Sequence, residues 1–359
     1  MNKKILFIST SRADYNLISG LYKTIKLKKN FNKKLILTGS SISKKYGYDK
    51  NKDFTTNKKI FINLTSSSKK KFPTILSTYF KKFYLLLNKE NPNFLVILGD
   101  RYETLVLTFV AKLLGIKIFH FHGGEKSYGS LDNEWRDLIS KLSDYHFVSH
   151  KDYKKNLIKL NLDNKKIFVV GSIGAYLLKK HKPLRININK KYKKKIIVTY
   201  HVATKDIKKS RQEFLEMIDS IKKLKNFYFC ITYPGHDLDS NFIINKLDHL
   251  KKNFNHVEII KKASIYSFYD YLKNFDLFMG NSSSGIIESA SANIPFLNIG
   301  LRQNGRLKSN NVFDVEGKNK IISKSIVKIL KLNKKKFKNI YLDTNFKTKI
   351  NNIIFKKIL

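Results

Sequence analysis

The residues best suited to chemistry lie in two nearby stretches, GDRYET and HFHGGEKSYGSLDNEWRD. Asp100 and Glu125 each follow a short apolar run. Asp132 and Arg136 are four residues apart in a helical pattern, which places them on one helix face. Carboxylates gathered in one place suit proton removal and delivery, because crowding raises the pKa of one carboxyl while its neighbour stays ionised. The pattern predicts acid–base chemistry, with Asp100, Glu125 and Asp132 as candidate catalytic residues.

Each of these features also has a simpler structural interpretation. Asp100 could cap a helix, and an Asp/Arg pair at this spacing is most often a surface ion pair. His120 and His122 alternate along an expected strand and could begin a metal site, but no clear third ligand accompanies them. We therefore expect no metal and keep the metal site as the weaker alternative.

A second group of residues suits an anion. In GNSSSGIIESA, a Ser/Gly loop runs into a helix, so that Ser282, Ser283 and successive N–H groups could cradle a phosphate. Glu288 could bind a ribose hydroxyl. His201 directly follows another apolar run, and Arg12 lies in STSRADY, where its guanidinium could grip an anion. A lone His is usually structural, and STSRADY equally fits an ordinary capped helix start.

These residues sit between elements that alternate in type, since short β-branched or aromatic runs are separated by longer amphipathic stretches. The pattern predicts parallel strands joined by crossover helices, and in such sheets ligands bind outside the carboxyl ends of the strands. The expected strands are 4–9, 34–38, 94–98, 116–121, 145–148, 166–170, 195–200, 226–233, 256–260, 276–280, 294–299 and 311–315. The expected helices are 14–29, 72–90, 101–114, 133–143, 150–160, 207–223, 240–252, 265–274, 284–291 and 319–331.

The length of 359 residues exceeds that of a usual single core, so we expect two domains. Residues 179–195 have no periodic apolar face and carry a lysine run, which is typical of a linker. The prediction is a Rossmann-like domain at 1–178 carrying the proton-transfer residues and a second one at 196–335 carrying the anion-binding residues. Residues 336–359 would form a helix that packs back on the first domain.

The net charge of +44 raises the question of nucleic-acid binding. Only seven residues are arginine, and five of them, including Arg12 and Arg136, lie in the motif segments, whereas lysine is spread throughout. No zinc spacing or arginine-rich arm accompanies the charge, so we expect no nucleic-acid partner. One cysteine and no apolar run of membrane-spanning length lead us to expect a soluble, cytoplasmic protein with no membrane association.

The motifs taken together resemble the hydrolysing UDP-N-acetylglucosamine 2-epimerases of sialic-acid and legionaminic-acid type pathways. The resemblance rests on SRADY, LGDRYE, HFHGGE, the D-x-x-x-R helix, VGSIG, TYH, GNSSSGIIE and NIGLRQNGR, in order over about residues 5–315. It implies a GT-B-like fold of two Rossmann-type domains with the UDP-sugar in the cleft between them. It also implies no cofactor, and a homo-oligomer, a dimer or tetramer.

The reaction implied by the resemblance eliminates UDP from C1 as a base removes the C2 proton. Water then adds to the glycal and releases an N-acetylmannosamine-type sugar. Asp100, Glu125 and Asp132 match the acidic residues of proton transfer, without an assignment of base and acid. The resemblance places Arg12 and Arg136 on the diphosphate or sugar, His201 near the diphosphate, Ser282 and Ser283 on phosphate, and Glu288 on the ribose.

Departures from the family pattern affect the identity of the sugar more than the reaction. Ser41 and Asp137 stand where His is usual, and Ile173 and Val202 stand where Pro is usual. UDP-N,N'-diacetylbacillosamine therefore remains an alternative substrate to UDP-N-acetylglucosamine. Two competing hypotheses for the function are a GT-B glycosyltransferase and a basic nucleic-acid-binding protein.

Overall fold

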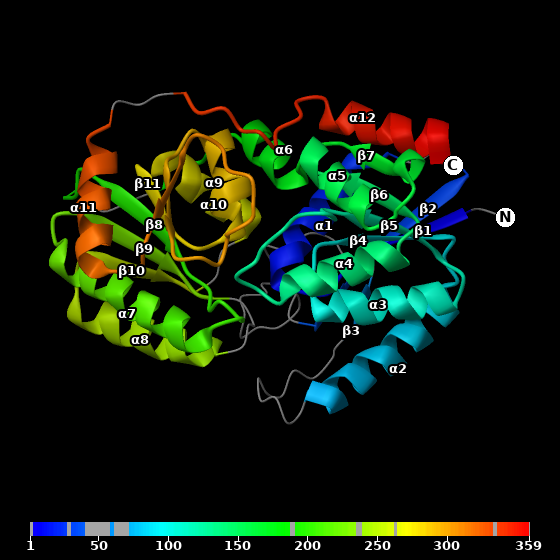
Figure 1. Cartoon of the computed structure of the whole chain (residues 1–359), viewed down its shortest axis with the longest axis horizontal. Helices are drawn as coiled ribbons and strands as arrows, with labels where there is room; N and C mark the ends of the chain where they lie inside the picture. The colour runs from blue at the N-terminus through cyan, green and yellow to red at the C-terminus, as the bar shows by residue number, and fades with distance from the viewer. Residues whose placement is uncertain are drawn as a thin grey trace. The chain divides into compact units, whose positions relative to one another are not determined.

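The apolar runs form two parallel sheets in the computed structural model, which describes residues 3–26, 30–39, 58–60, 72–186, 191–234, 239–261, 264–332 and 336–358 (Figure 1). The seven-stranded sheet has the order β3-β2-β1-β4-β5-β6-β7, and the six-stranded sheet has the order β10-β9-β8-β11-β12-β13. The strands are β1 (Lys3–Ser9), β2 (Phe31–Thr38), β3 (Lys58–Ile60), β4 (Phe94–Leu98), β5 (Lys117–Phe121), β6 (Tyr145–Val148), β7 (Ile167–Val169), β8 (Lys195–Thr199), β9 (Tyr228–Thr232), β10 (Val257–Ile260), β11 (Leu277–Gly280), β12 (Phe296–Ile299) and β13 (Val312–Val315).

Amphipathic helices connect these strands. They are α1 (Arg12–Thr24), α2 (Phe72–Glu90), α3 (Tyr102–Leu113), α4 (Asp132–Leu142), α5 (Lys151–Lys159), α6 (Ile173–Lys180), α7 (Ile207–Lys223), α8 (Ser240–Asn253), α9 (Ile265–Asn274), α10 (Ser283–Ile287), α11 (Asn319–Leu330) and α12 (Phe346–Ile353). In both sheets the strand order reverses beside the first strand, between β1 and β4 and between β8 and β11. Ligands of doubly wound folds bind at such reversals.

The chain divides into two compact units. Unit 1 comprises Met1–Lys126, Leu131–Ile173 and Asp343–Leu359, and unit 2 comprises Ser127–Ser130 and Gly174–Leu342. The return of the C-terminal segment to unit 1 has specific contacts. The Asn351 side chain accepts a hydrogen bond from Lys26 N at 2.9 Å and donates to Thr24 O at 3.2 Å, and the ring of Phe355 meets that of Phe31 edge-on.

Each sheet carries its own apolar core. The first is centred on Leu6, Ile8, Leu95 and Ile97, and α2 and α3 pack against it. The second is centred on the strands β8, β9 and β11, and β10, β12, α7, α8 and α11 also contribute to it. The central strands β4 and β9 are buried along their whole length, as expected of parallel strands covered on both faces.

Four expectations about elements need correction. The helix expected over 14–29 ends at Thr24, because Lys33 Nζ binds Ile25 O at 2.8 Å and Asn351 binds Thr24 O, so distant side chains satisfy its last carbonyls. The helix expected over 284–291 breaks after Ile287 into a 3₁₀ turn, Ser289–Ala292. The expected elements did not include β3 or α6, and α6 runs into the region expected to be linker.

Candidate functional site

Asp100 and Glu125 are brought together in unit 1 by Arg136. The Arg136 side chain is 1% exposed, donates from Nη2 to Asp100 Oδ2, and donates from Nη1 to Glu125 O at 2.7 Å. Asp100 follows β4 and Glu125 follows β5, which are neighbouring strands of the sheet. We call these three residues the carboxylate cluster. A planar guanidinium can hold two groups in fixed directions, so the cluster has a defined geometry.

The Glu125 carboxylate is held by two further side chains. It is 2% exposed, and its Oε1 accepts hydrogen bonds from His122 Nδ1 at 2.8 Å and Ser149 Oγ at 3.0 Å. His122 does not continue the strand as expected, because its φ of 66° lies in the left-handed region. Ser149, which follows β6, was not among the sequence candidates. Its position one strand further along could have suggested it.

His120 is fully buried and joins the parts of this cluster. Its Nε2 lies 2.8 Å from Gly99 O, so Nε2 carries the proton and donates, and Nδ1 faces Ser140 Oγ at 3.2 Å. Burial lowers the pKa of His120 to about 3, which keeps the ring neutral. His120 therefore links the residue before Asp100 to the turn of α4 that follows Arg136.

The two glycines of HGGE make the turn that presents Glu125. Gly124 has a φ of 75°, and a Cβ there would lie 2.3 Å from Tyr153 O. A Cβ on Gly123 would lie 2.9 Å from Ser140 Oγ. Any other residue at Gly124 would push the Glu125 loop away from α5.

The remaining sequence candidates of unit 1 lie at two helix starts. Asp132 begins α4 and is partly buried, one turn before Arg136. STSRADY forms a complete capping box, in which Asp14 Oδ1 accepts from Ser11 N at 3.0 Å and Asp14 N is bound by the Ser11 hydroxyl. Arg12 begins α1, but its side chain lies outside what the structure describes, as does residue Ser41.

In unit 2, the loop after β11 is tied to the loop after β8. The Asn281 side chain accepts from His201 N and donates to His201 O, both at 2.8 Å. The backbones are close because Gly280, with φ 132°, has no side chain, and a Cβ there would lie 1.9 Å from Thr199 O. Ser282 precedes α10, and its hydroxyl is paired with that of Ser284 at 2.8 Å. We call residues 281–284 the Ser282 loop.

Two side chains that the sequence candidates did not include support the Ser282 loop. Arg302 Nη1 and Gln303 Nε2 both donate to Asn281 O, at 3.0 and 2.8 Å. Arg302 Nε is buried with no partner among the described residues. Arg302 lies in NIGLRQNGR, one of the motif segments that contain most of the arginines, but only the fold shows that it reaches this loop.

Glu288 lies just beyond α10 in a buried setting. Burial raises the pKa of its carboxyl to about 8, and a hydrogen bond with the Tyr269 hydroxyl acts in the opposite direction. A Cβ on Gly174 would lie 2.4 Å from Glu288 Oε1, so the glycine of VGSIG makes room for this carboxyl. Tyr269 also donates to Gly174 O at 3.1 Å.

The described part of the chain lacks two classes of feature. No group of three or more His, Cys, Asp or Glu side chains is arranged to hold a metal ion there. None of the helices described is both long and apolar enough to cross a membrane.

Two parallel sheets with the same strand order and candidate residues at their carboxyl ends define an α/β protein of the GT-B-like class, which confirms the expected fold. A solved structure, Methanocaldococcus jannaschii UDP-GlcNAc 2-epimerase in complex with UDP-GlcNAc and UDP, is similar with a TM-score of 0.79. It is 18% identical and the match covers 98% of this chain and 99% of that one, a likeness of fold.

The model of the family described as UDP-N-acetylglucosamine 2-epimerase matches residues 23–355, so the chain belongs to this family of enzymes acting on UDP-sugars. It is 32% identical to GDP/UDP-N,N'-diacetylbacillosamine 2-epimerase (hydrolyzing) of Campylobacter jejuni, over 88% of this chain and 84% of that protein. It is 30% identical to UDP-N,N'-diacetylbacillosamine 2-epimerase (hydrolyzing) of Legionella pneumophila, over 96% and 93%.

Proposed function

We propose that the protein is a hydrolysing 2-epimerase that converts a UDP-sugar into UDP and a free 2-epimerised sugar. The observation that carries the proposal is the carboxylate cluster, in which one buried arginine fixes Asp100 beside the backbone of Glu125. Removing the C2 proton and completing the hydration both need positioned acid–base groups. Asp100, Glu125 and Asp132 are the proposed groups, with base and acid left unassigned.

The leaving UDP develops negative charge, which unit 2 is proposed to stabilise. Its Ser282 loop offers hydroxyls and N–H groups, and the His201 backbone is locked to the same loop by Asn281. Positioned donors lower the barrier most when they are fixed before the reaction, because they need no reorganisation. Ser282, Ser283 and His201 are proposed on the diphosphate.

Three further side chains complete the proposed UDP contacts. Arg302 supplies a cation next to the Ser282 loop. Glu288 is proposed on the ribose hydroxyls. Arg12 is proposed on the diphosphate from the resemblance, and the sugar or diphosphate contact of Arg136 stays a prediction, since its described bonds go to the carboxylate cluster.

The sugar favoured by the comparisons is N,N'-diacetylbacillosamine. Two relatives that match most of this chain are named as hydrolysing epimerases of that UDP-sugar. These names support UDP-N,N'-diacetylbacillosamine as the substrate over UDP-N-acetylglucosamine, whose product would be free N-acetylmannosamine. They also favour a legionaminic-type pathway over a sialic-acid pathway. We therefore propose UDP-N,N'-diacetylbacillosamine as the faster substrate.

We further propose a division of roles between the two domains. The first domain supplies proton transfer and the second binds UDP, residues 179–195 link them, and the reaction needs no cofactor or metal. The protein is proposed to act in the cytoplasm as a homo-oligomer, without a nucleic-acid partner. A glycosyltransferase is the competing activity of the same fold class, and it would require an acceptor.

The deciding experiment is an NMR time course in deuterated water with each UDP-sugar in parallel. We expect free UDP together with a 2-epimerised sugar carrying deuterium at C2, because the carbon loses its proton before water adds. UDP-N,N'-diacetylbacillosamine should react faster. Release of UDP only in the presence of an added acceptor would instead establish glycosyl transfer, and no release from either sugar would refute the proposal.

A further inference from the structure

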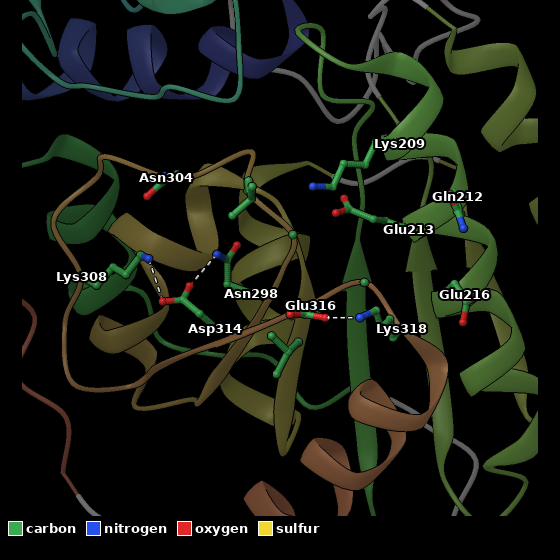
Figure 2. Close-up of a pocket in the computed structure, with 14 residues that line it drawn as sticks. Lys209, Gln212, Glu213, Glu216, Asn298, Asn304, Lys308, Asp314, Glu316 and Lys318 are labelled. Atoms are coloured by element: carbon green, nitrogen blue, oxygen red, sulfur yellow. Dashed lines mark hydrogen bonds and ion pairs between the residues drawn. The ribbon is translucent and has the colours of Figure 1, made fainter.

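Unit 2 contains a cavity of about 690 Å³ that the proposed reaction does not use (Figure 2). It lies at the carboxyl ends of β12 and β13 and is bordered by α7. The Ser282 loop, by contrast, follows β11. Four of the chain's 27 acidic residues line it beside three lysines, so the lining is slightly acidic in a chain of net charge +44. The acids are Glu213, Glu216, Asp314 and Glu316.

A buried acceptor in the cavity wall lacks a donor. Asn298 is 1% exposed, and its Nδ2 donates to Asp314 Oδ1 at 2.8 Å. A carboxylate accepts only, so this bond fixes the orientation of the amide and leaves Oδ1 on the other side. Asn298 Oδ1 has no partner among the described residues. Leaving a buried acceptor unsatisfied destabilises the folded protein, and a bound hydrogen-bond donor would remove that penalty.

Most of the acids are already occupied, which limits the groups open to a ligand. Asp314 Oδ2 accepts from Lys308 Nζ at 2.7 Å, Glu216 Oε2 accepts twice from Asn319, and Glu316 is paired with Lys318. Asn298 and Asp314 lie on one side of the cavity in Figure 2, with the α7 side chains across from them.

Glu213 is the exception, and the backbone makes room for it. A Cβ on Gly300 would lie 2.3 Å from Glu213 Oε2, and a Cβ on Gly317 would lie 2.3 Å from Glu213 Cγ. The only bond described for its carboxyl is a long one from the Tyr200 hydroxyl, at 3.4 Å. The two glycines thus hold a half-buried carboxyl in the wall with capacity to bind a ligand.

The lining groups that keep capacity for a hydrogen bond include acceptors and donors together. Asn298 Oδ1 and Glu213 accept, whereas Lys209 and Gln212 donate, and Leu301, 59% exposed, adds an apolar surface at the rim. Hydroxyl groups both donate and accept, so a ligand rich in them satisfies both kinds of group. A phosphate would bring negative charge beside Glu213 and the other acids of the lining, and a polyamine lacks the acceptors. We propose that this cavity is a second binding site, for a small neutral polyhydroxylated ligand of the monosaccharide class.

The test is saturation-transfer NMR on the full chain with saturating UDP, which occupies the proposed reaction site. The probes are N-acetylglucosamine and myo-inositol as neutral polyols, spermidine as a polycation and inorganic phosphate as an anion. Gln212→Trp fills the cavity from an exposed position of α7, and Lys208→Trp places the same ring on that helix outside the cavity lining.

We expect at least one polyol to bind the wild type and the Lys208→Trp control, with affinity at least fivefold lower in Gln212→Trp. Glu213→Gln should weaken binding several-fold with UDP affinity unchanged. No polyol binding, equal binding to Gln212→Trp, or a Gln212-sensitive response to spermidine or phosphate alone would overturn the proposal. The UDP-sugar time course is separate, so failure of the proposed function would leave this result standing.

Discussion

The two units carry different candidate sites at the same place in the same topology. In unit 1 the carboxyl ends of β4 and β5 carry charged side chains, and Arg136 joins Asp100 to the Glu125 loop. In unit 2 the end of β11 carries neutral groups, and Asn281 joins its loop to His201 through backbone bonds. The fold supplies the position, and the side chains decide the chemistry.

The difference follows from what each site is proposed to hold. Proton transfer needs ionisable groups at fixed distances, and strong, directional hydrogen bonds from a buried guanidinium can fix them. A diphosphate brings its own charge, so neutral hydroxyl and N–H donors suffice, with Arg302 adding a nearby cation. Loss of the Arg136 hydrogen bonds in unit 1 should therefore lower kcat. Loss of the hydrogen bonds that hold the Ser282 loop in unit 2 should lower UDP affinity.

The largest effect should come from Glu125→Gln. General acid–base groups contribute about 10²–10⁴-fold, so we expect kcat to fall by this factor while the Kd for UDP, measured by calorimetry, stays unchanged. Glu134→Gln is the matched control, because Glu134 is an exposed carboxylate on α4. Normal turnover of Glu125→Gln would remove this residue from the proton-transfer role.

Arg136→Lys should separate charge from geometry. Lysine keeps the charge but cannot bind Asp100 and Glu125 O in fixed directions, so we expect kcat to fall by about 10²-fold with UDP affinity preserved. Arg302→Lys is the counterpart in unit 2 and should weaken UDP binding instead. The comparison between the units would fail if both variants changed the same parameter.

His120→Gln should have a smaller effect of the same kind. A glutamine amide can donate to Gly99 O but has no second ring nitrogen to meet Ser140 Oγ, so the contact between the Asp100 loop and α4 is lost. We expect kcat to fall about tenfold with KM unchanged, since small misplacements are costly to rate. Because the pKa of His120 is about 3, its loss should leave the shape of the pH–rate profile above pH 5 unchanged.

In Ser140→Ala, a fall in Tm that accompanies the fall in kcat would argue that His120 acts only in packing. That variant removes the contact with Ser140 Oγ while leaving the ring in place.

The smallest expected effect is a pH dependence of the protein's thermal stability that arises from Glu288. Its pKa is about 8 in the folded protein and near 4.5 when exposed, so the folded state holds an extra proton between these values. This contribution to stability is fully present below about pH 4.5 and is lost as the pH rises through 8. Relative to Glu288→Gln, the wild-type Tm should therefore fall from pH 5 to pH 8.

A constant Tm difference over that range would mean that Glu288 is not buried as a neutral acid. The exposed Glu316→Gln change provides the baseline. Separately, Glu288→Ala should weaken UDP binding, and an unchanged Kd would count against the ribose contact.

The local pattern of the sequence was sufficient for most of the elements. The strands at Phe94–Leu98 and Tyr145–Val148 and the helices at Phe72–Glu90 and Ile207–Lys223 have the expected bounds, because apolar runs and helical periodicity are local signals. The end of α1 was missed, since Lys33 and Asn351 satisfy its last carbonyls from elsewhere in the chain.

The candidate site shows the same division at the level of side chains. The sequence by itself determined which residue types follow the strands, so Asp100, Glu125, Ser282 and Glu288 could be singled out from motifs and strand ends. Only the tertiary structure decided how they are held. The bridge through Arg136, the neutral His120, the Asn281 tie and the buried carboxyl of Glu288 all depend on segments distant in sequence. Burial and long-range hydrogen bonds arise only when the chain is folded, so no local pattern can specify them.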